Sequence, residues 1–284
     1  TVSVQGYWYF YFKGYGFERG WDLINHSAAP RVVRIEGDKS SNGEKIATEL
    51  ISELEKLQAS GERFFAWGHW MDPHADYVAH EGMDFGSDSR ARYDGEVAFT
   101  DAQLGRVFRA LERLELKDST VVMLTSDHGE AFGEHGMIRH GFELWEELVR
   151  VPLMIRVPGA RPLRVDARRS LIDLAPTIAD VFGLSEEQRG KMQGTSLFLD
   201  WGDEVEERPL LIDMPRGPNN RERRAFISDQ KKLITSQGMV LGIYDLANDP
   251  LEKKDLSEDK VLRDELLGEM KRFLAHLKVK KARR

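Results

Sequence analysis

The chain has 284 residues, of which 41% are apolar and 31% charged, with a formal net charge of −7. That length can bury one large core, and an aromatic content of 10% excludes a disordered chain. The acidic balance gives no global basic field for nucleic acid, and the lack of cysteine excludes disulfides, thiolate metal sites and a cysteine nucleophile within these residues.

Apolar runs and helical spacings alternate along the first two thirds of the chain. Strands are predicted at residues 2–12, 64–70, 120–125 and 151–157, because these runs are short, apolar and rich in β-branched or aromatic residues. Helices are predicted over 46–57, 97–114 and 171–182, where Leu, Ile and Val recur at helical spacing, and Gly183 is a suitable helix stop. The alternation predicts an α/β fold with a mainly parallel sheet and helices on both faces.

The character of the sequence changes after about residue 194. Segment 195–225 is rich in prolines and charges, residues 225–234 and 239–244 look like hairpin strands, and a helix follows over 261–277. We therefore expect an α/β domain over residues 1–200 and a small α+β subdomain over 201–284. The basic run at 278–284 is expected to be a solvated tail.

The most informative stretch is the apolar strand that ends in Asp127-His128-Gly129. Ligands of open α/β sheets bind outside the carboxyl ends of strands, and a carboxylate beside an imidazole offers two ligands to one divalent cation. Gly129 would let the backbone turn tightly. The alternative is a capping aspartate beside an exposed histidine.

Two further segments carry histidines after or near strand ends. One is the glycine-punctuated loop 133–141 with His135 and His140, and the other is 67–74, which ends in Asp72-Pro73-His74. Histidine can protonate a leaving oxygen near neutral pH or donate to an anionic substrate. A lone histidine is more often structural, but the repetition at strand ends favours a common site.

These motifs, in this order, resemble the sulfatase family over nearly the whole chain. The matching blocks are Gly-Tyr-Gly-Phe-Glu-Arg-Gly-Trp-Asp at 14–22, the strand ending in Asp-Pro-His-x-x-Tyr at 64–77, Tyr-Asp-Gly-Glu-Val at 93–97, Thr-Ser-Asp-His-Gly-Glu at 125–130, the His-Gly to Val-Pro-Leu run at 140–158, Ile-Asp-Leu-Ala-Pro-Thr at 172–177 and Ile-Tyr-Asp-Leu-Ala-Asn-Asp-Pro at 243–250. The resemblance implies an alkaline phosphatase-like fold and hydrolysis of sulfuric esters.

The resemblance also carries roles to particular positions. Asp127 and His128 match the family's metal ligands, His74 matches the histidine that contacts sulfate and helps the leaving oxygen depart, and His140 occupies a sulfate-contacting position. The implied cofactor is a divalent metal, calcium first, with zinc or manganese as alternatives. In related phosphoethanolamine transferases the histidine spaced like His140 is itself a zinc ligand.

Other matched residues are expected to be structural. Glu146, Glu147 and Arg150 would form a charged junction between a helix and a strand, and His135 is a weaker candidate than His140. Solvation or capping is expected for Asp94, Glu96 and Asp101, and a surface position for His26, His80 and His276.

Family members carry an Asp-Asp metal pair and a Cys-x-Pro-x-Arg or Ser-x-Pro-x-Arg nucleophile, oxidised to formylglycine, before the segment that starts here. Neither occurs in these residues, and the run from Ser27 to Arg31 has one residue too many before its proline. The opening residues also lack an initiator Met and a leader signature. We expect this sequence to begin partway through a longer protein and to be inactive alone. We expect the complete protein to hydrolyse a sulfate ester of a small molecule or a glycan. The sequence leaves the cellular location open. The family resemblance favours a periplasmic or extracellular location, and any membrane contact would come only from a preceding segment.

Two alternatives stay open. One is a phosphoester enzyme of the same superfamily, a phosphodiesterase or a phosphoethanolamine-type transferase. The other is a non-catalytic sulfatase-like domain for binding or assembly, although keeping Asp127, His128, His74 and His140 together argues against a decayed site.

Overall fold

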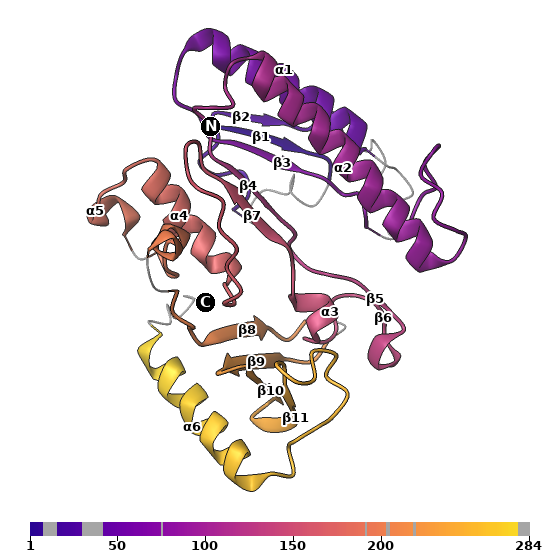
Figure 1. The fold of residues 1–284 in the computed structure, drawn as a ribbon, viewed down its shortest axis with the longest axis vertical. Helices are drawn as coiled ribbons and strands as arrows, with labels where there is room; N and C mark the ends of the chain where they lie inside the picture. Colours follow the sequence, from indigo (N-terminus) through magenta and orange to yellow (C-terminus); the bar gives the residue numbers. More distant parts are fainter. Residues whose placement is uncertain are drawn as a thin grey trace. The chain divides into compact units, whose positions relative to one another are not determined.

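A computed structural model describes residues 1–7, 16–29, 42–74, 76–190, 192–202, 205–217 and 220–277. They form two compact units, one of residues 1–120 with 157–159 and the other of 121–156 with 160–284. Figure 1 shows both as ribbons coloured along the sequence. The domain boundary near residue 200 stays a prediction, because compactness alone does not define a domain.

The first unit is built on a parallel sheet in the order β2-β1-β3 (Figure 1). Its strands are β1 (Val2–Gln5), β2 (Leu23–Asn25) and β3 (Ala66–His69). All four residues of β1 are buried, as expected for the central strand of a covered parallel sheet. The predicted strand over 2–12 is confirmed at its start, and residues 8–12 lie outside the described part.

Two long helices complete this unit. Helix α1 (Gly43–Ser60) buries Ile46, Leu50 and Leu54 and packs on β1 and β3, while α2 (Ser89–Arg113) packs on α1. The side chain of Asp88 accepts a hydrogen bond from the N–H of Ala91 and so caps the N-terminus of α2. Both helices were predicted from spacing, and each is longer than its apolar stripe.

The second unit begins with strand β4 (Val122–Thr125), which pairs antiparallel with β7 (Leu153–Arg156). Between them lie the short antiparallel pair β5 (Ala131–Phe132) and β6 (Ile138–Arg139), the turn η2 (Glu134–Gly136) and helix α3 (Glu146–Val149). The next elements are η3 (Leu171–Asp173), α4 (Leu174–Val181), α5 (Glu186–Arg189) and η4 (Leu197–Trp201). Gly183 follows α4 with φ of 66°, which confirms the predicted stop.

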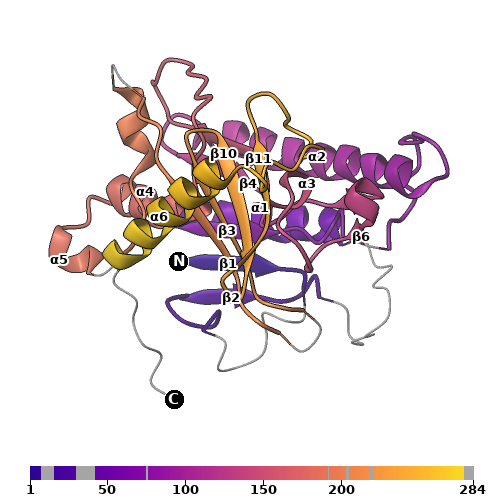
Figure 2. The same cartoon turned by 90° about the horizontal axis from the view of Figure 1, so that it is seen from below.

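A four-stranded antiparallel sheet in the order β11-β10-β9-β8 ends the second unit. Its strands are β8 (Leu210–Met214), β9 (Arg223–Ser228), β10 (Lys231–Ser236) and β11 (Met239–Asp245). Helix α6 (Lys260–His276) packs against β9 and β10, as Figures 1 and 2 show. Leu266 and Met270 join Phe226, Leu233 and Ile243 in the core beneath the helix.

The predicted fold class is confirmed, and three details differ. The run 225–234 is two strands, because Asp229 and Gln230 adopt positive φ and turn the chain between β9 and β10. Strand β8 was not predicted and lies within the segment rich in prolines and charges, and β7 runs antiparallel to its neighbour. Among the described residues, no helix has the length and apolarity needed to cross a membrane.

Candidate active site

Asp127 and His128 leave the carboxyl end of β4 directly. The Thr125 hydroxyl donates to the carbonyl of Pro152 at 2.8 Å and anchors the strand end to the segment before β7. The Ser126 hydroxyl donates to the carbonyl of His128 at 2.6 Å and holds the turn. The Asp127 carboxylate, 74% exposed, accepts from the N–H of His128 at 3.0 Å. A rigid strand end therefore presents an exposed carboxylate.

Gly129 is required by close packing. A Cβ at this position would lie 2.1 Å from the carbonyl oxygen of Glu147, and the Gly129 N–H donates to the carbonyl of Leu148 at 2.8 Å. Any other residue would push the strand end away from α3. Close packing against Glu147, rather than the predicted tight turn, therefore requires glycine here.

The His128 ring has a defined orientation. Its Nδ1 lies 2.9 Å from the carbonyl oxygen of Gly129, and since a carbonyl only accepts, this contact requires the proton on Nδ1. Nε2, which lies 3.8 Å from the nearer Asp127 oxygen, then carries the lone pair in the neutral ring. Metal-binding histidines usually donate their second ring N–H to a carbonyl or carboxylate in this way.

His140 joins this group from the loop after β6. Its ring stacks on that of His128 with centroids 4.0 Å apart and planes 27° apart. Its Nδ1 lies 3.0 Å from a carboxylate oxygen of Glu130, whose side chain is 4% exposed. Glu130 was not predicted as a site residue, although its position directly after Asp127-His128-Gly129 is a signal in the sequence that could have identified it.

The second unit thus brings Asp127, His128 and His140 together with Glu130. His74 belongs to the first unit, so its convergence with Asp127 stays a prediction. Its N–H donates to the carbonyl of Met71 at 2.7 Å in the turn after β3, and its ring centroid lies 6.5 Å from that of Tyr7. The turn after β3 is where the sequence placed it.

The donor set at 127 and 128 fits a divalent cation. It combines an exposed carboxylate with an imidazole whose tautomer is fixed by a backbone carbonyl. Calcium prefers oxygen ligands, whereas imidazole suits zinc, so the set by itself leaves the metal open. Both residues reach solvent, which suits a site that must admit a substrate.

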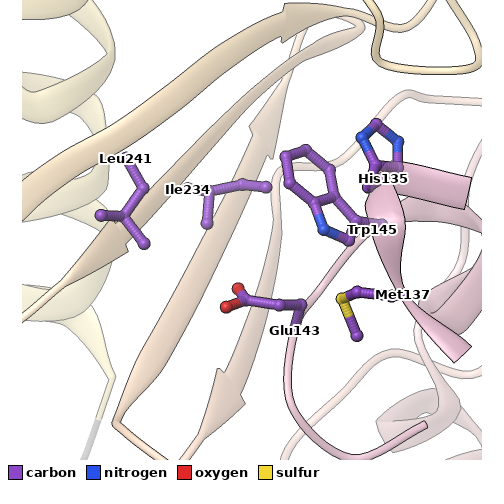
Figure 3. A pocket seen from close by; sticks show the side chains of 6 residues that line it. All are labelled: His135, Met137, Glu143, Trp145, Ile234 and Leu241. Atoms are coloured by element: carbon purple, nitrogen blue, oxygen red, sulfur yellow. The ribbon is translucent and has the colours of Figure 1, made fainter. Parts of the chain in front are cut away.

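His135 lies in a different environment. Its ring stacks on Trp145 with centroids 3.9 Å apart, and its Nε2 lies 3.8 Å from Glu147. Figure 3 shows His135 and Trp145 on one side of a pocket that Ile234 and Leu241 line on the other. Glu143, also in this pocket, is paired with Arg223 at 2.6 Å. These contacts give His135 a packing role.

Two predicted surface positions are wrong. His80 is only 10% exposed and stacks on Phe99 with centroids 3.9 Å apart, and Glu96 is 3% exposed on the inner face of α2. Asp94, in contrast, is 45% exposed and paired with Arg90, as predicted. Helical spacing alone did not distinguish the two carboxylates, because the residues that contact Glu96, Val78 and His80, come from the loop before the helix.

The sulfatase family profile matches residues 4–184. The chain belongs to the sulfatase family. Bovine arylsulfatase K (Bos taurus) is 39% identical over 181 residues, which cover 59% of this chain and 33% of that protein. The chain spans less than half the length of this and the other curated sulfatases that it matches.

Solved structures show the same fold at lower identity. The sulfatase yidJ of Bacteroides fragilis aligns with a TM-score of 0.70 and 20% identity over 82% of this chain and 58% of that one. A phosphonate monoester hydrolase of Agrobacterium radiobacter aligns with a TM-score of 0.66 and 23% identity, covering 86% and 62%. The fold is therefore shared with hydrolases of more than one ester class.

Proposed function

We propose that the protein containing this chain is a metal-dependent sulfuric ester hydrolase. Family membership supports the reaction class. The local geometry that supports catalysis is the exposed group at the end of β4, where Asp127 and His128 stand beside the ring of His140. A chain used only for binding would have no need of two histidines whose Nδ1 atoms are each directed to an oxygen acceptor.

Asp127 and His128 would hold the metal, calcium by family resemblance and zinc or manganese as alternatives. A bound divalent cation would polarise the sulfate oxygens at this strand end. Gly129 and Ser126 maintain the turn, so both ligands stay directed to one side of it. The proton on Nδ1 of His128 leaves Nε2 as the ligand atom.

His140 and His74 would act on the substrate. The Glu130 carboxylate, buried beside Nδ1, would orient the His140 ring so that it can contact a sulfate oxygen. His74 would protonate the departing alcohol, which requires it to approach the same substrate. That approach is part of the proposal.

The nucleophile would come from outside these residues. No Cys-x-Pro-x-Arg or Ser-x-Pro-x-Arg occurs in the sequence, and covalent sulfate transfer needs an activated nucleophile facing the metal. We therefore propose that this chain alone is inactive. The substrate class would be the sulfate ester of a small molecule or glycan, and an exported location is proposed on family grounds alone.

The test compares ester classes on the complete protein. Aryl sulfate, aryl phosphate and aryl phosphonate hydrolysis are measured for the parent and for Asp127→Asn, with the exposed Asp264→Asn as the matched control. We expect sulfate to be the preferred substrate and Asp127→Asn to lower the activity by about 10³-fold. Preference for phosphate or phosphonate would instead assign the phosphoester alternative, and no hydrolysis of any ester would favour the binding domain.

A further inference from the structure

The first unit contains a buried cluster of potential metal ligands that the sulfatase chemistry does not use. Single ligand atoms of Asp72, His80 and Glu96 all lie within 4.8 Å of one another. Asp72 and His80 both lie in the loop between β3 and α2, and Glu96 lies on α2. The loop and the helix that follows it thus meet at one point.

Burial makes the charged forms of Glu96 and His80 costly. Asp72 is 4% and Glu96 2% exposed, and the Phe99 ring covers the His80 imidazole at 3.9 Å. Burial raises the pKa of Glu96 to about 7, opposed by the Val78 N–H and helped by the negative charge of Asp72. Burial also lowers the pKa of His80, which favours the neutral imidazole that binds metals.

Two atoms of this cluster are buried without a hydrogen bond. Within the described ranges, His80 Nε2 and Glu96 Oε2 are buried and have no hydrogen-bond partner. The other Glu96 oxygen accepts from the Val78 N–H at 2.6 Å. Buried polar atoms are nearly always satisfied, so orphaned ones call for an ion or a water.

The spacing suits a shared cation better than a direct contact. His80 Nε2 and Glu96 Oε1 are 3.9 Å apart, which is too long for a hydrogen bond. Two atoms that each lie about 2.1 Å from one zinc ion can be up to about 4.2 Å apart. One imidazole and two carboxylates form a donor set that zinc accepts.

A second acidic cluster in the other unit shows the contrast. His135, Glu147 and Glu252 also lie within 4.8 Å, but the Lys232 ammonium is 2.9 Å from Glu252. A lysine already supplies positive charge there. At Glu96 the groups that influence its pKa are the Val78 N–H and Asp72, and neither is a cation.

We propose that Asp72, His80 and Glu96 form a structural zinc site, separate from the metal site at Asp127. The zinc would join both ends of the segment 72–80 to α2. The Thr100 hydroxyl already donates to the Asp72 carbonyl at 3.1 Å, so the cation would complete an existing attachment. His74 lies within this segment, and the site would keep its turn in place.

The test is a zinc count on the full chain. Protein stripped with a chelator is dialysed against zinc chloride, and bound zinc is measured by mass spectrometry in the parent, Glu96→Gln and Asp94→Asn. We expect Glu96→Gln to lose one equivalent of zinc and Asp94→Asn, an exposed carboxylate on the same helix, to lose none. Glutamine keeps the acceptor for the Val78 N–H, so the fold should survive.

Two further arms keep the result decisive. Asp127→Asn distinguishes the two sites. If the zinc is bound at Glu96, then adding Glu96→Gln to Asp127→Asn must still remove one equivalent of zinc. If Glu96→Gln does not fold, His80→Gln takes its place. We expect His80→Gln to bind zinc more weakly than the parent, by up to about 100-fold. Equal zinc in parent, Glu96→Gln and His80→Gln, or no zinc in the parent, would overturn the proposal and leave a proton shared between Asp72 and Glu96.

Discussion

The group around His128 and the cluster around Glu96 contain the same kinds of side chain in opposite surroundings. At the end of β4 the Asp127 carboxylate is 74% and the His128 ring 40% exposed. In the first unit the Glu96 side chain is 3% and His80 10% exposed. Water can solvate the first group, whereas only protein groups, an ion or a proton can satisfy the second.

This difference separates two uses of acid and imidazole. In the exposed group, the Gly129 carbonyl and the Glu130 carboxylate orient the two histidine rings, while solvent and substrate can still reach them. A buried group in which two atoms, His80 Nε2 and Glu96 Oε2, lack a hydrogen bond makes the fold depend on whatever satisfies them. The same residue types therefore favour a catalytic role at the exposed end of β4 and a structural role in the buried cluster around Glu96. The difference in burial distinguishes the two roles.

The largest effect is expected at the exposed group. Asp127→Asn removes a charged ligand, and the sulfatase activity of the complete protein should fall by about 10³-fold because transition-state charge loses its metal support. The measurement is kcat/KM on an aryl sulfate, with circular dichroism to verify the fold. Activity within a few-fold of the parent would show that the metal is held elsewhere.

A buried group that has its counter-ion offers the next test. Lys232 is fully buried and lies 3.0 Å from Glu146 and 2.9 Å from Glu252. Lys232→Met leaves two buried carboxylates facing each other, so the free energy of unfolding should fall by about 3 kcal/mol or more in urea melts. Lys231→Met, next along β10 and partly exposed, should cost less than about 1 kcal/mol. Equal losses would contradict the role of burial.

Glu130 tests how the exposed group is oriented. Glu130→Gln keeps a hydrogen-bond acceptor for His140 but removes the charge, and activity should fall about 10-fold. Glu130→Asp should recover part of that loss, which a purely structural defect would not predict. Kinetics on the complete protein, with melting temperatures for each variant, separate orientation from stability; unchanged kinetics would remove Glu130 from the site.

The smallest effect concerns a carboxylate near solvent that has partners. The Asn248 side chain, and then Lys231, lower the pKa of Asp245 to about 2. Because the folded pKa lies below the ordinary value of 3.8, this stabilisation is present above about pH 4 and is lost as the pH falls toward 2. Thermal melts of parent and Asp245→Asn should differ at pH 5 and converge near pH 2. A constant difference would exclude the linkage.

The sequence by itself determined the family, the longer strands and helices of the first two thirds, and the placement of Asp127 and His128 at a strand end, but not the short elements β2, β5, β6 and α3. These features depend on local runs and motif order, which the chain carries without its tertiary contacts. The spacing also identified α6 and the stop at Gly183. The prediction that His74 approaches the same site is still untested.

Only the tertiary structure decided which polar residues are buried. Glu96 and Asp94 lie two residues apart on one helix, but Val78 and His80 contact the first, whereas the side chain of the second is 45% exposed. Gly129 is fixed by the carbonyl of Glu147, and Glu130 by the ring of His140. Such contacts join segments distant in sequence, and burial sets the cost of charge there, so helical spacing and motif order could not reveal them.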